Sequence, residues 1–376
     1  MNRPTCRKAV VLWLCCLSTV VAVASTPIVI FDSSSKSLKF AVVSDAEAQQ
    51  YQAQQPETVW VGEEQLKTSQ MKPAPWRDFK SQVEVVEFTS SFASVRPKTV
   101  YTWFSGCTNL TTVKGLQYLD LSEATEMRSW FSGCTSLTEI DLSSLNTRNV
   151  KYMGSMFYGC TSLISVNLGS INTSNVLSME TMFQGASKLE SVDLSKLDLS
   201  NVNNLSKMFQ ECTALKDVKF PKFYTANLTD MSYLFYKCST MEKVDLSGFN
   251  TKNVTNMSYM FEFCSSLLEV DLTNFDTSSL SKADEMFSHS IRLKKIYSDK
   301  DWQVASIMFF NCPKLSGSIV FDAQKYSGYL YAKTSNGYFT PNYFSQKRAI
   351  TILGEDGTLY LTSSQTPFHI GDTHCH

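Results

Sequence analysis

The stretch NVTNMSYMFEFCSSLLEVDLTNFDT, from Asn253 to Thr277, decides the fold because the chain repeats it. Residues 227–251, which lie 26 positions earlier, read NLTDMSYLFYKCSTMEKVDLSGFNT. The shared pattern is an aromatic residue three positions before a Cys or another small residue, and it occurs nine times. Its aromatic positions are Phe104, Phe131, Phe157, Phe183, Phe209, Phe235, Phe261, Phe287 and Phe309. Self-similarity at a fixed period predicts a repeat architecture.

Each repeat unit has two halves with different periodicities. The first half predicts a helix, because its apolar residues recur at the spacing of one helical face: Val254, Met257, Met260, Phe261 and Cys264. Asn253 stands just before this half, where an Asn side chain can cap a helix, and Asn149, Asn175, Asn201 and Asn227 hold the equivalent place. The second half, LLEVDLTNF, alternates as a strand does, with Val270 and Leu272 inward and Asp271 outward.

One strand and one helix cannot bury their own apolar faces, but stacked units can. The sequence therefore predicts an α/β solenoid with one parallel strand and one helix in each unit of about 26 residues, curved so that the strands line a concave face. Alternating segments at 28–43 and 349–364 predict β-rich terminal caps, the second as a hairpin. We expect a signal peptide over 1–24, an N-terminal cap over 25–100, nine repeats over 101–322 and a C-terminal cap with a hairpin and tail over 323–376. For the C-terminal region, a small separate module is the alternative to a cap.

The first 24 residues have the pattern of a secretory signal peptide. Arg3, Arg7 and Lys8 precede an apolar run from 9 to 23, and Ala22-Val23-Ala24 offers a cleavage site. We therefore expect an exported protein at the cell surface or outside the cell, with no membrane insertion of the mature chain. The formal net charge of −1 gives no overall basic footprint for nucleic acid.

The repeats resemble those of the BspA-like leucine-rich-repeat surface proteins of bacteria. The residues that carry the resemblance are FNTKNVTNMSYMFEFCSSLLEVDLTNFDTSSL, from Phe249 to Leu280, and their copies. The flanking segments Val83–Leu116 and Tyr331–Pro341 are similar to the ends of that family's repeat domains. The resemblance implies display at the cell surface and binding to host or extracellular-matrix proteins.

Residue types that carry chemistry are present, but their spacing does not favour catalysis. Seven cysteines share one repeat position, where Ala186 and Ser290 also occur, so we expect buried free thiols. The C-terminal His369, His374, Cys375 and His376 are too loosely spaced to predict a metal site. His289, the only other histidine, lies beside Ser288 and Ser290, and no nucleophile motif, phosphate loop or dinucleotide fingerprint occurs. We expect no enzyme activity, no cofactor and no metal.

The outward positions of the predicted strands are the candidate binding surface. Short polar and acidic side chains dominate there, which favours a basic or extended protein segment as ligand. A solvated strand face, in which Asp is only part of the repeat pattern, remains an equal alternative. The candidate residues are Glu139, Asp141, Asn167, Asp193, Lys219, Lys243, Asp245, Glu269 and Asp271. Tyr233, Tyr236 and Tyr259, on the opposite side of the repeats, form a second candidate surface.

These features predict a non-catalytic surface binding protein, an adhesin for a host or matrix protein. Two alternatives stay open: a structural surface protein that associates with copies of itself or with envelope partners, and a secreted hydrolase with its site in the C-terminal region. Self-association on sizing columns would favour the first, and activity that survives deletion of the repeats would favour the second.

Overall fold

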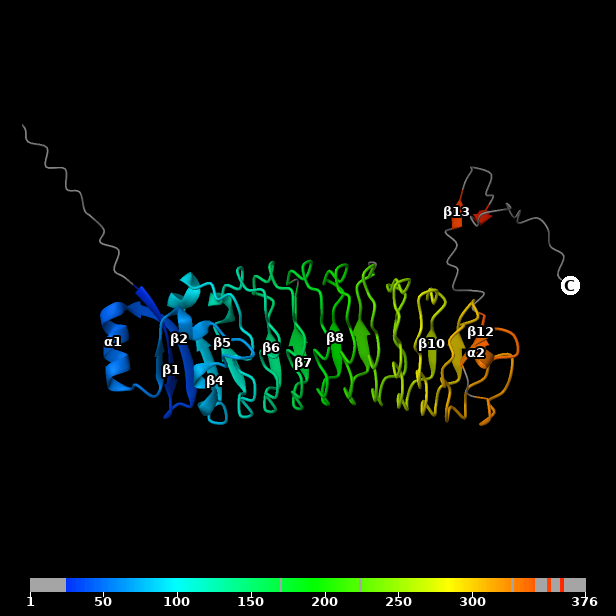
Figure 1. Cartoon of the computed structure of the whole chain (residues 1–376), viewed down its shortest axis with the longest axis horizontal. Helices are drawn as coiled ribbons and strands as arrows, with labels where there is room; N and C mark the ends of the chain where they lie inside the picture. The colour runs from blue at the N-terminus through cyan, green and yellow to red at the C-terminus, as the bar shows by residue number, and fades with distance from the viewer. Residues whose placement is uncertain are drawn as a thin grey trace, which may run out of the picture.

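The chain winds into an elongated, nearly straight rod in which each repeat forms one coil (Figure 1). The computed structural model describes residues 25–169, 171–222, 225–325 and 328–341, and the backbone of 350–352 and 359–361. The predicted signal peptide and the histidine-rich tail lie outside these residues. The rod shows little curvature, so the predicted concave surface, which is formed by the short strands of the repeats, is named the strand face.

The centre of the rod is a column of phenylalanine rings, one from each coil. The column runs from Phe104 to Phe309, and consecutive ring centroids lie 5.5 to 5.9 Å apart. Every ring of the column is fully buried among Leu, Met and Val side chains of the same and neighbouring coils. Burying one such ring contributes roughly 1.5–3 kcal/mol, so the stacked coils form one continuous core, as the repeat pattern predicts.

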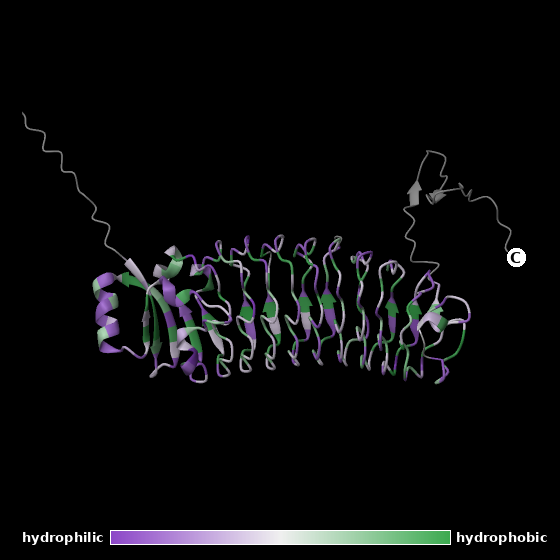
Figure 2. Ribbon diagram, in the orientation of Figure 1, coloured by the Kyte–Doolittle hydropathy of each residue, from purple (hydrophilic) through white to green (hydrophobic). Residues whose placement is uncertain are grey.

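The strand face consists of short parallel strands, one from most coils. The strands of the repeats are β5 (Thr112–Lys114), β6 (Glu139–Asp141), β7 (Ser165–Asn167), β8 (Ser191–Asp193), β9 (Asp217–Lys219), β10 (Glu269–Asp271) and β11 (Lys295–Tyr297). In the second, fourth and sixth of these strands (β6, β8 and β10) the central residue is turned into the core and its neighbours are exposed, so hydrophobic and hydrophilic residues alternate (Figure 2).

The parallel sheet is interrupted along the rod. β6 pairs with β7 and β8 pairs with β9, while β10 and β11 form a sheet with β12 (Phe339–Thr340). The coil after β9 has no strand over 241–246. Pro221 follows β9 and has no N–H to donate to a ladder, and its carbonyl oxygen would lie only 2.4 Å from a Cβ built on Gly248 of the next coil. This close approach of the two backbones, and the missing N–H of Pro221, coincide with the interruption of the sheet after β9.

The prediction of a helix in each repeat is wrong. In the described residues, the first half of each repeat unit forms tight turns instead. In each coil from Phe104 to Phe287 the residues two before and two after the Phe have positive φ, for example Thr181 at 55° and Gly185 at 76°. Two left-handed residues within five positions cannot belong to an α-helix. The backbone N–H groups bond to the next coil instead: the N–H of Phe131 donates to the carbonyl of Met156 at 2.9 Å.

This turn face carries its own ladder between coils. Single-residue parallel bridges connect consecutive coils without interruption: Thr99 to Glu126, Tyr152, Ser178, Asn204, Asp230, Asn256 and Lys282. Asn253, predicted to cap a helix, donates through Nδ2 to the carbonyl of Ala226 in the preceding coil at 2.8 Å. Asn149, Asn175, Asn201 and Asn227 make the same bond. The repeated Asn therefore connects coils rather than capping a helix.

The cysteine position faces the core, next to the phenylalanine column. All seven cysteines of the described residues are free and buried, which confirms the prediction for the repeats. The Sγ of Cys134 donates to the carbonyl of Phe104 at 3.2 Å, and the Oγ of Ser290 makes the equivalent bond to Phe261 at 2.7 Å. Burial raises the pKa of the Cys107 and Cys160 thiols to about 12.

An antiparallel hairpin begins the N-terminal end of the rod. β1 (Ser25–Asp32) pairs with β2 (Ser37–Ser44), β3 (Val59–Val61) adds to β1, and β4 (Val85–Phe88) joins β2 to β5 of the first coil. The helix α1 (Asp45–Gln54) begins at a capping box formed by Ser44 and Glu47. Four short 3₁₀ helices complete this end: η1 (Glu63–Leu66), η2 (Pro75–Phe79), η3 (Ser90–Ser94) and η4 (Leu116–Tyr118).

Aromatic residues cover the two ends of the phenylalanine column. At the N-terminal end, the ring of Phe40 contacts Trp103 and Phe104 at centroid distances of 5.4 and 5.9 Å. At the C-terminal end, Tyr338 contacts Phe309 at 5.2 Å. The short helix α2 (Gly328–Tyr331) lies there, and β13 (Ile350–Ile352) pairs antiparallel with β14 (Leu359–Leu361) in the predicted hairpin segment. Both column ends are thereby protected from water.

Candidate functional site

The structure places all nine predicted site residues in exposed positions on the strand face. Seven of them belong to strands β6, β7, β8, β9 and β10, where each flanks a residue that is turned into the core. Lys243 and Asp245 belong to the coil without a strand and are also exposed. The fold therefore brings these side chains into one row along the rod. The row of nine defines the strand-face site.

Most acidic residues of the strand-face site also have a structural role. In Asp141, Asp193, Asp245 and Asp271 the Oδ1 atom accepts a hydrogen bond of 2.8 to 2.9 Å from the backbone N–H two residues later. Asn167 accepts the same bond from Gly169 at 3.0 Å. These Asx turns end each strand and begin the next corner of the coil. The repeat pattern therefore keeps Asp or Asn at this position for the turn as well as for any ligand.

In two of these residues, Asp141 and Asp193, the turn also favours the ionised carboxylate by lowering its pKa. The hydroxyl of Ser143 and then its N–H lower the pKa of Asp141 below its usual value, and Ser195 acts on Asp193 in the same way. Lys219, on the neighbouring strand, lowers the pKa of Asp193 further. The strand face therefore presents negative charge at neutral pH.

Two shallow hollows lie on the strand face. One, of about 850 Å³, lies over β5, β6 and β7 and is lined by Glu139, Asp141 and Asn167 among others. The other, of about 580 Å³, lies where the sheet is interrupted and is lined by Lys219, Lys222 and Asp245 with Phe220 and Asp217. The first hollow is acidic and the second holds both signs of charge. They give the site two places where a partner's side chains could be received.

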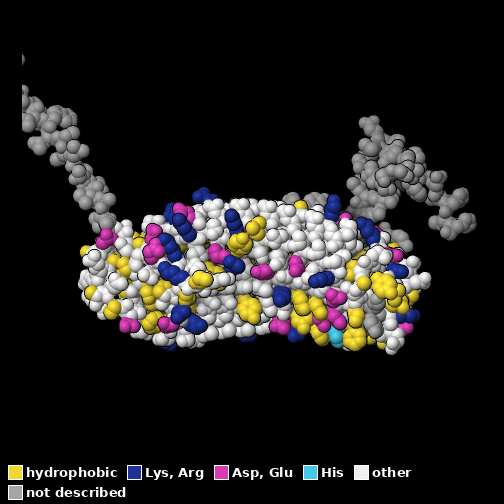
Figure 3. Space-filling model, viewed as in Figure 1, with side chains coloured by type: hydrophobic (Ala, Val, Ile, Leu, Met, Phe, Trp, Pro, Cys, Tyr) yellow, Lys and Arg dark blue, Asp and Glu magenta, His cyan; other side chains and the backbone are white. Residues whose placement is uncertain are grey.

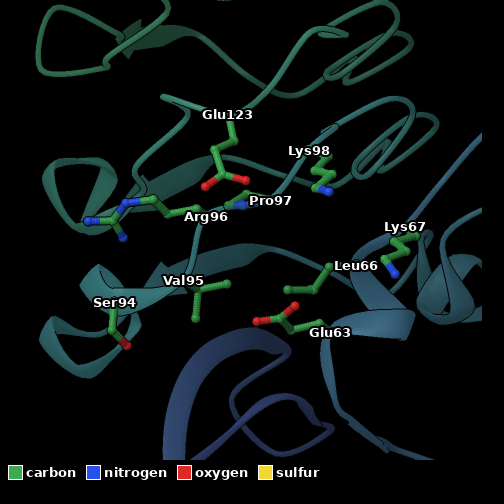
Figure 4. A pocket seen from close by; sticks show the side chains of 9 residues that line it. All are labelled: Glu63, Leu66, Lys67, Ser94, Val95, Arg96, Pro97, Lys98 and Glu123. Atoms are coloured by element: carbon green, nitrogen blue, oxygen red, sulfur yellow. The ribbon is translucent and has the colours of Figure 1, made fainter.

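A separate hollow of about 610 Å³ lies between the N-terminal cap and the first coil (Figure 4). Glu63 and Leu66 of η1 point toward Val95 and Pro97 across it, and Glu123 and Lys98 lie at its rim. Arg96, which also lines it, is ion-paired to Asp120 at 2.9 Å. This cap pocket has mixed charge and no arrangement of nucleophile and base.

The three tyrosines of the second candidate surface do come together on the turn face. The rings of Tyr233 and Tyr259 stack at 4.5 Å, and Tyr236 meets Tyr233 at 5.5 Å. Phe263 extends this strip toward His289, whose ring stacks on it at 4.5 Å. Figure 3 shows hydrophobic and acidic side chains gathered around the histidine at this end of the rod.

A cluster that the sequence analysis did not predict adjoins this aromatic strip, and His289 belongs to both. Glu262, Glu285 and His289 offer ligand atoms that all lie within 4.8 Å of one another. Burial, and then the charge of Glu285, raise the pKa of Glu262 to about 7. The sequence does hold a signal for this cluster, because the three residues depart from the repeat pattern. At the equivalent positions an earlier coil has Ser132, Ser129 and Gly133, in that order.

A protein family accounts for the repeats. The family described as "Mycoplasma protein of unknown function, DUF285" matches residues 98–223 and 216–319, which together make up more than half of the chain. The chain belongs to this family. DUF285 is a BspA-like repeat family, so the resemblance drawn from the sequence is confirmed. As a DUF285 protein, the chain is a leucine-rich-repeat solenoid.

Solved structures similar to this DUF285 chain are leucine-rich-repeat proteins. One from Bacteroides ovatus is 19% identical and covers 63% of this chain and 72% of its own, with a TM-score of 0.35. A leucine-rich cell surface protein from Faecalibacterium prausnitzii is 17% identical and covers 65% and 69%, also with a TM-score of 0.35. Among curated proteins, none matches this chain. Within the described residues, every helix is too short or too polar to cross a bilayer.

Proposed function

We propose that this DUF285 protein is a non-enzymatic surface protein that binds a partner protein through the strand-face site. The observation that carries the proposal is the row of nine exposed side chains held by stacked coils, with six carboxylates against two lysines. The partner segment that fits this charge is extended and basic. A host or extracellular-matrix protein is the proposed source of that segment, in keeping with the predicted export.

The rod favours binding because its surface is ordered before the partner arrives. The backbone of the strand face is fixed by hydrogen bonds between coils, and its acidic side chains are oriented by their Asx turns. A preordered surface loses little conformational entropy on binding. The acidic hollow over β6 and β7 is the place where we expect basic side chains to dock.

The test separates charge from the structural role of the aspartates. Asp193→Asn together with Asp271→Asn removes two negative charges from the strand face and retains the Oδ1 acceptor of both turns. The matched control is Asp198→Asn with Asp276→Asn, because these residues form the same Asx turns later in the same coils, beyond the strands. Both variants lose the same charge and should unfold alike.

The assay is binding of the full chain to immobilised extracellular-matrix and plasma proteins at low and physiological salt. We expect saturable binding that salt weakens, a loss of roughly tenfold in affinity for the strand-face pair and little change for the control pair. An equal loss of affinity in both variants would mean that the overall charge of the protein, and not the strand-face site, determines binding. Unchanged binding in the strand-face pair, or no binding to any protein of the panel, would refute the proposal.

A further inference from the structure

Three metal-binding side chains meet on the turn face, in two neighbouring coils. Glu262 follows Phe261 in one coil, and Glu285 and His289 flank Phe287 in the next. The Nδ1 atom of His289 lies 3.7 Å from Oε1 of Glu262, and the ligand atoms of all three residues lie within 4.8 Å of one another. Two carboxylates and one imidazole are a common ligand set for a divalent transition metal.

The fold holds these three side chains in place from several directions. Phe261 and Phe287 stack at 5.7 Å in the central column, which fixes the two coils relative to each other. The ring of His289 stacks on Phe263 at 4.5 Å and meets the edge of Phe310 at 5.4 Å, which sets its orientation. The cluster is therefore built on the rigid part of the rod rather than on a loose loop.

Two polar atoms of the cluster lack hydrogen bonds among the described residues. Glu262 is only 8% exposed, and Oε2 of Glu285 and Nδ1 of His289 are buried with no hydrogen-bond partner. Lys237, a neighbouring cation, is paired to Glu211 at 3.0 Å. A buried carboxylate, that of Glu262, beside the half-buried one of Glu285 is costly unless a cation or a proton compensates the charge.

The repeat itself does not require these residues. The equivalent positions hold Ser132, Ser129 and Gly133 in an earlier coil, where the same turn forms with uncharged residues at all three positions. The three departures from the repeat occur together in space, although 23 residues separate Glu262 from Glu285 in the sequence. A scaffold role therefore does not explain them.

We propose that Glu262, Glu285 and His289 bind one divalent transition-metal ion, with zinc as the best fit to their nitrogen and oxygen ligands. Zinc bonds of about 2.1 Å in tetrahedral geometry place ligand atoms roughly 3.4 Å apart. The observed separations are at most 4.8 Å, so the ligand atoms need to approach one another by no more than about 1.4 Å. The fourth position is left to water or to a group from a partner.

The test uses zinc alone as the probe and the full chain as the protein. Because His369, His374, Cys375 and His376 could also bind zinc, the parent for all measurements carries Ala at the three tail histidines and Ser at Cys375. After chelation and dialysis, calorimetric titration and elemental analysis give the affinity and the stoichiometry. We expect one zinc per chain and a thermal midpoint that rises with zinc.

The variants take their substitutions from the protein's own repeats, so that the turns still form. His289→Gly and Glu285→Ser restore residue types found at these positions in other coils, and each should weaken zinc binding by at least tenfold, on the order of the loss that even indirect partners of a metal cause. Lys207→Ser, at the position equivalent to Glu285 three coils earlier and also with positive φ, is the matched control and should leave zinc binding unchanged. Stoichiometry below one in the parent, or affinity unchanged in His289→Gly, would overturn the proposal and leave a shared proton as the compensating charge.

Discussion

Replacing Gly185 with Ala distinguishes the observed turn from the helix that the sequence pattern predicts. The substitution should lower the free energy of unfolding if Gly185 lies in the turn and raise it if Gly185 lies in a helix. In a helix interior, Ala is about 1 kcal/mol more favourable than Gly. In the structure Gly185 has a φ of 76°, a left-handed conformation that costs an L-residue about 1–2 kcal/mol. A Cβ at this position would meet only Gly159, at 3.6 Å from its Cα and 3.7 Å from its N, which is ordinary contact. The cost is therefore conformational rather than steric.

The net effect combines this cost with a gain in the unfolded chain. Gly→Ala restricts the unfolded state and returns roughly 0.4–1 kcal/mol. We expect Gly185→Ala to lower the free energy of unfolding by about 1 kcal/mol. Ser129→Gly, at the other left-handed position of an earlier coil with a φ of 55°, should raise it by a few tenths of a kcal/mol.

The assay for both variants is urea unfolding followed by tryptophan fluorescence and by circular dichroism. The midpoint should move down for Gly185→Ala and slightly up for Ser129→Gly, with unchanged far-ultraviolet spectra in the folded state. A higher urea midpoint for Gly185→Ala than for the parent would refute the left-handed turn and favour a helix at this position.

Three further predictions concern the core, the thiols and the Asx turns. Phe183→Ala should lower the free energy of unfolding by about 3–5 kcal/mol and Phe183→Leu by much less, measured by urea unfolding, because the ring is fully buried in the stacked column. Cys134→Ser should fold and unfold nearly as the parent, since Ser290 already makes the same bond to the preceding coil, and alkylation of native protein at pH 8 should leave all repeat thiols unmodified; rapid labelling would contradict the burial. Because Ser195 lowers the pKa of Asp193, that carboxylate stabilises the fold above the pKa of the unfolded group, and the stability is lost as pH falls through the lower folded pKa. The urea concentration at the unfolding midpoint should therefore decrease as the pH is lowered below about 4. This decrease should be less steep in Asp193→Asn.

The sequence could predict the repeats, the core and the outward strand positions because these depend on burial alone. The phenylalanine column, the thiols and the alternation in β6, β8 and β10 all follow from which side chains avoid water. The helix prediction failed because apolar residues at helical spacing can also point inward from a pair of tight turns. Gly106, Gly133, Gly159 and Gly185, at one repeat position, were the signal that a left-handed residue is required there.

For the candidate site too, the sequence could predict which side chains are exposed but not how they are arranged in space. Exposure of Asp193 or Asp271 could be predicted from the strand period, but their Asx turns depend on the backbone path after the strand. The cluster of Glu262, Glu285 and His289 depends on which coils are neighbours and on where the turns place their side chains. Sequence comparison of one repeat with the next points to these residues only as exceptions, and their distances come from the stacked structure.

The bonds between coils run along the rod, in both the strand ladder and the ladder of the turn face. A force that pulls the two ends apart therefore loads these bonds one coil after another, as in opening a zipper, rather than shearing many at once. Each coil that yields would release 26 residues, roughly 90 Å of extended chain at about 3.5 Å per residue. A rod of this kind lengthens in steps at modest force, many times beyond its folded length, before the last coil is lost.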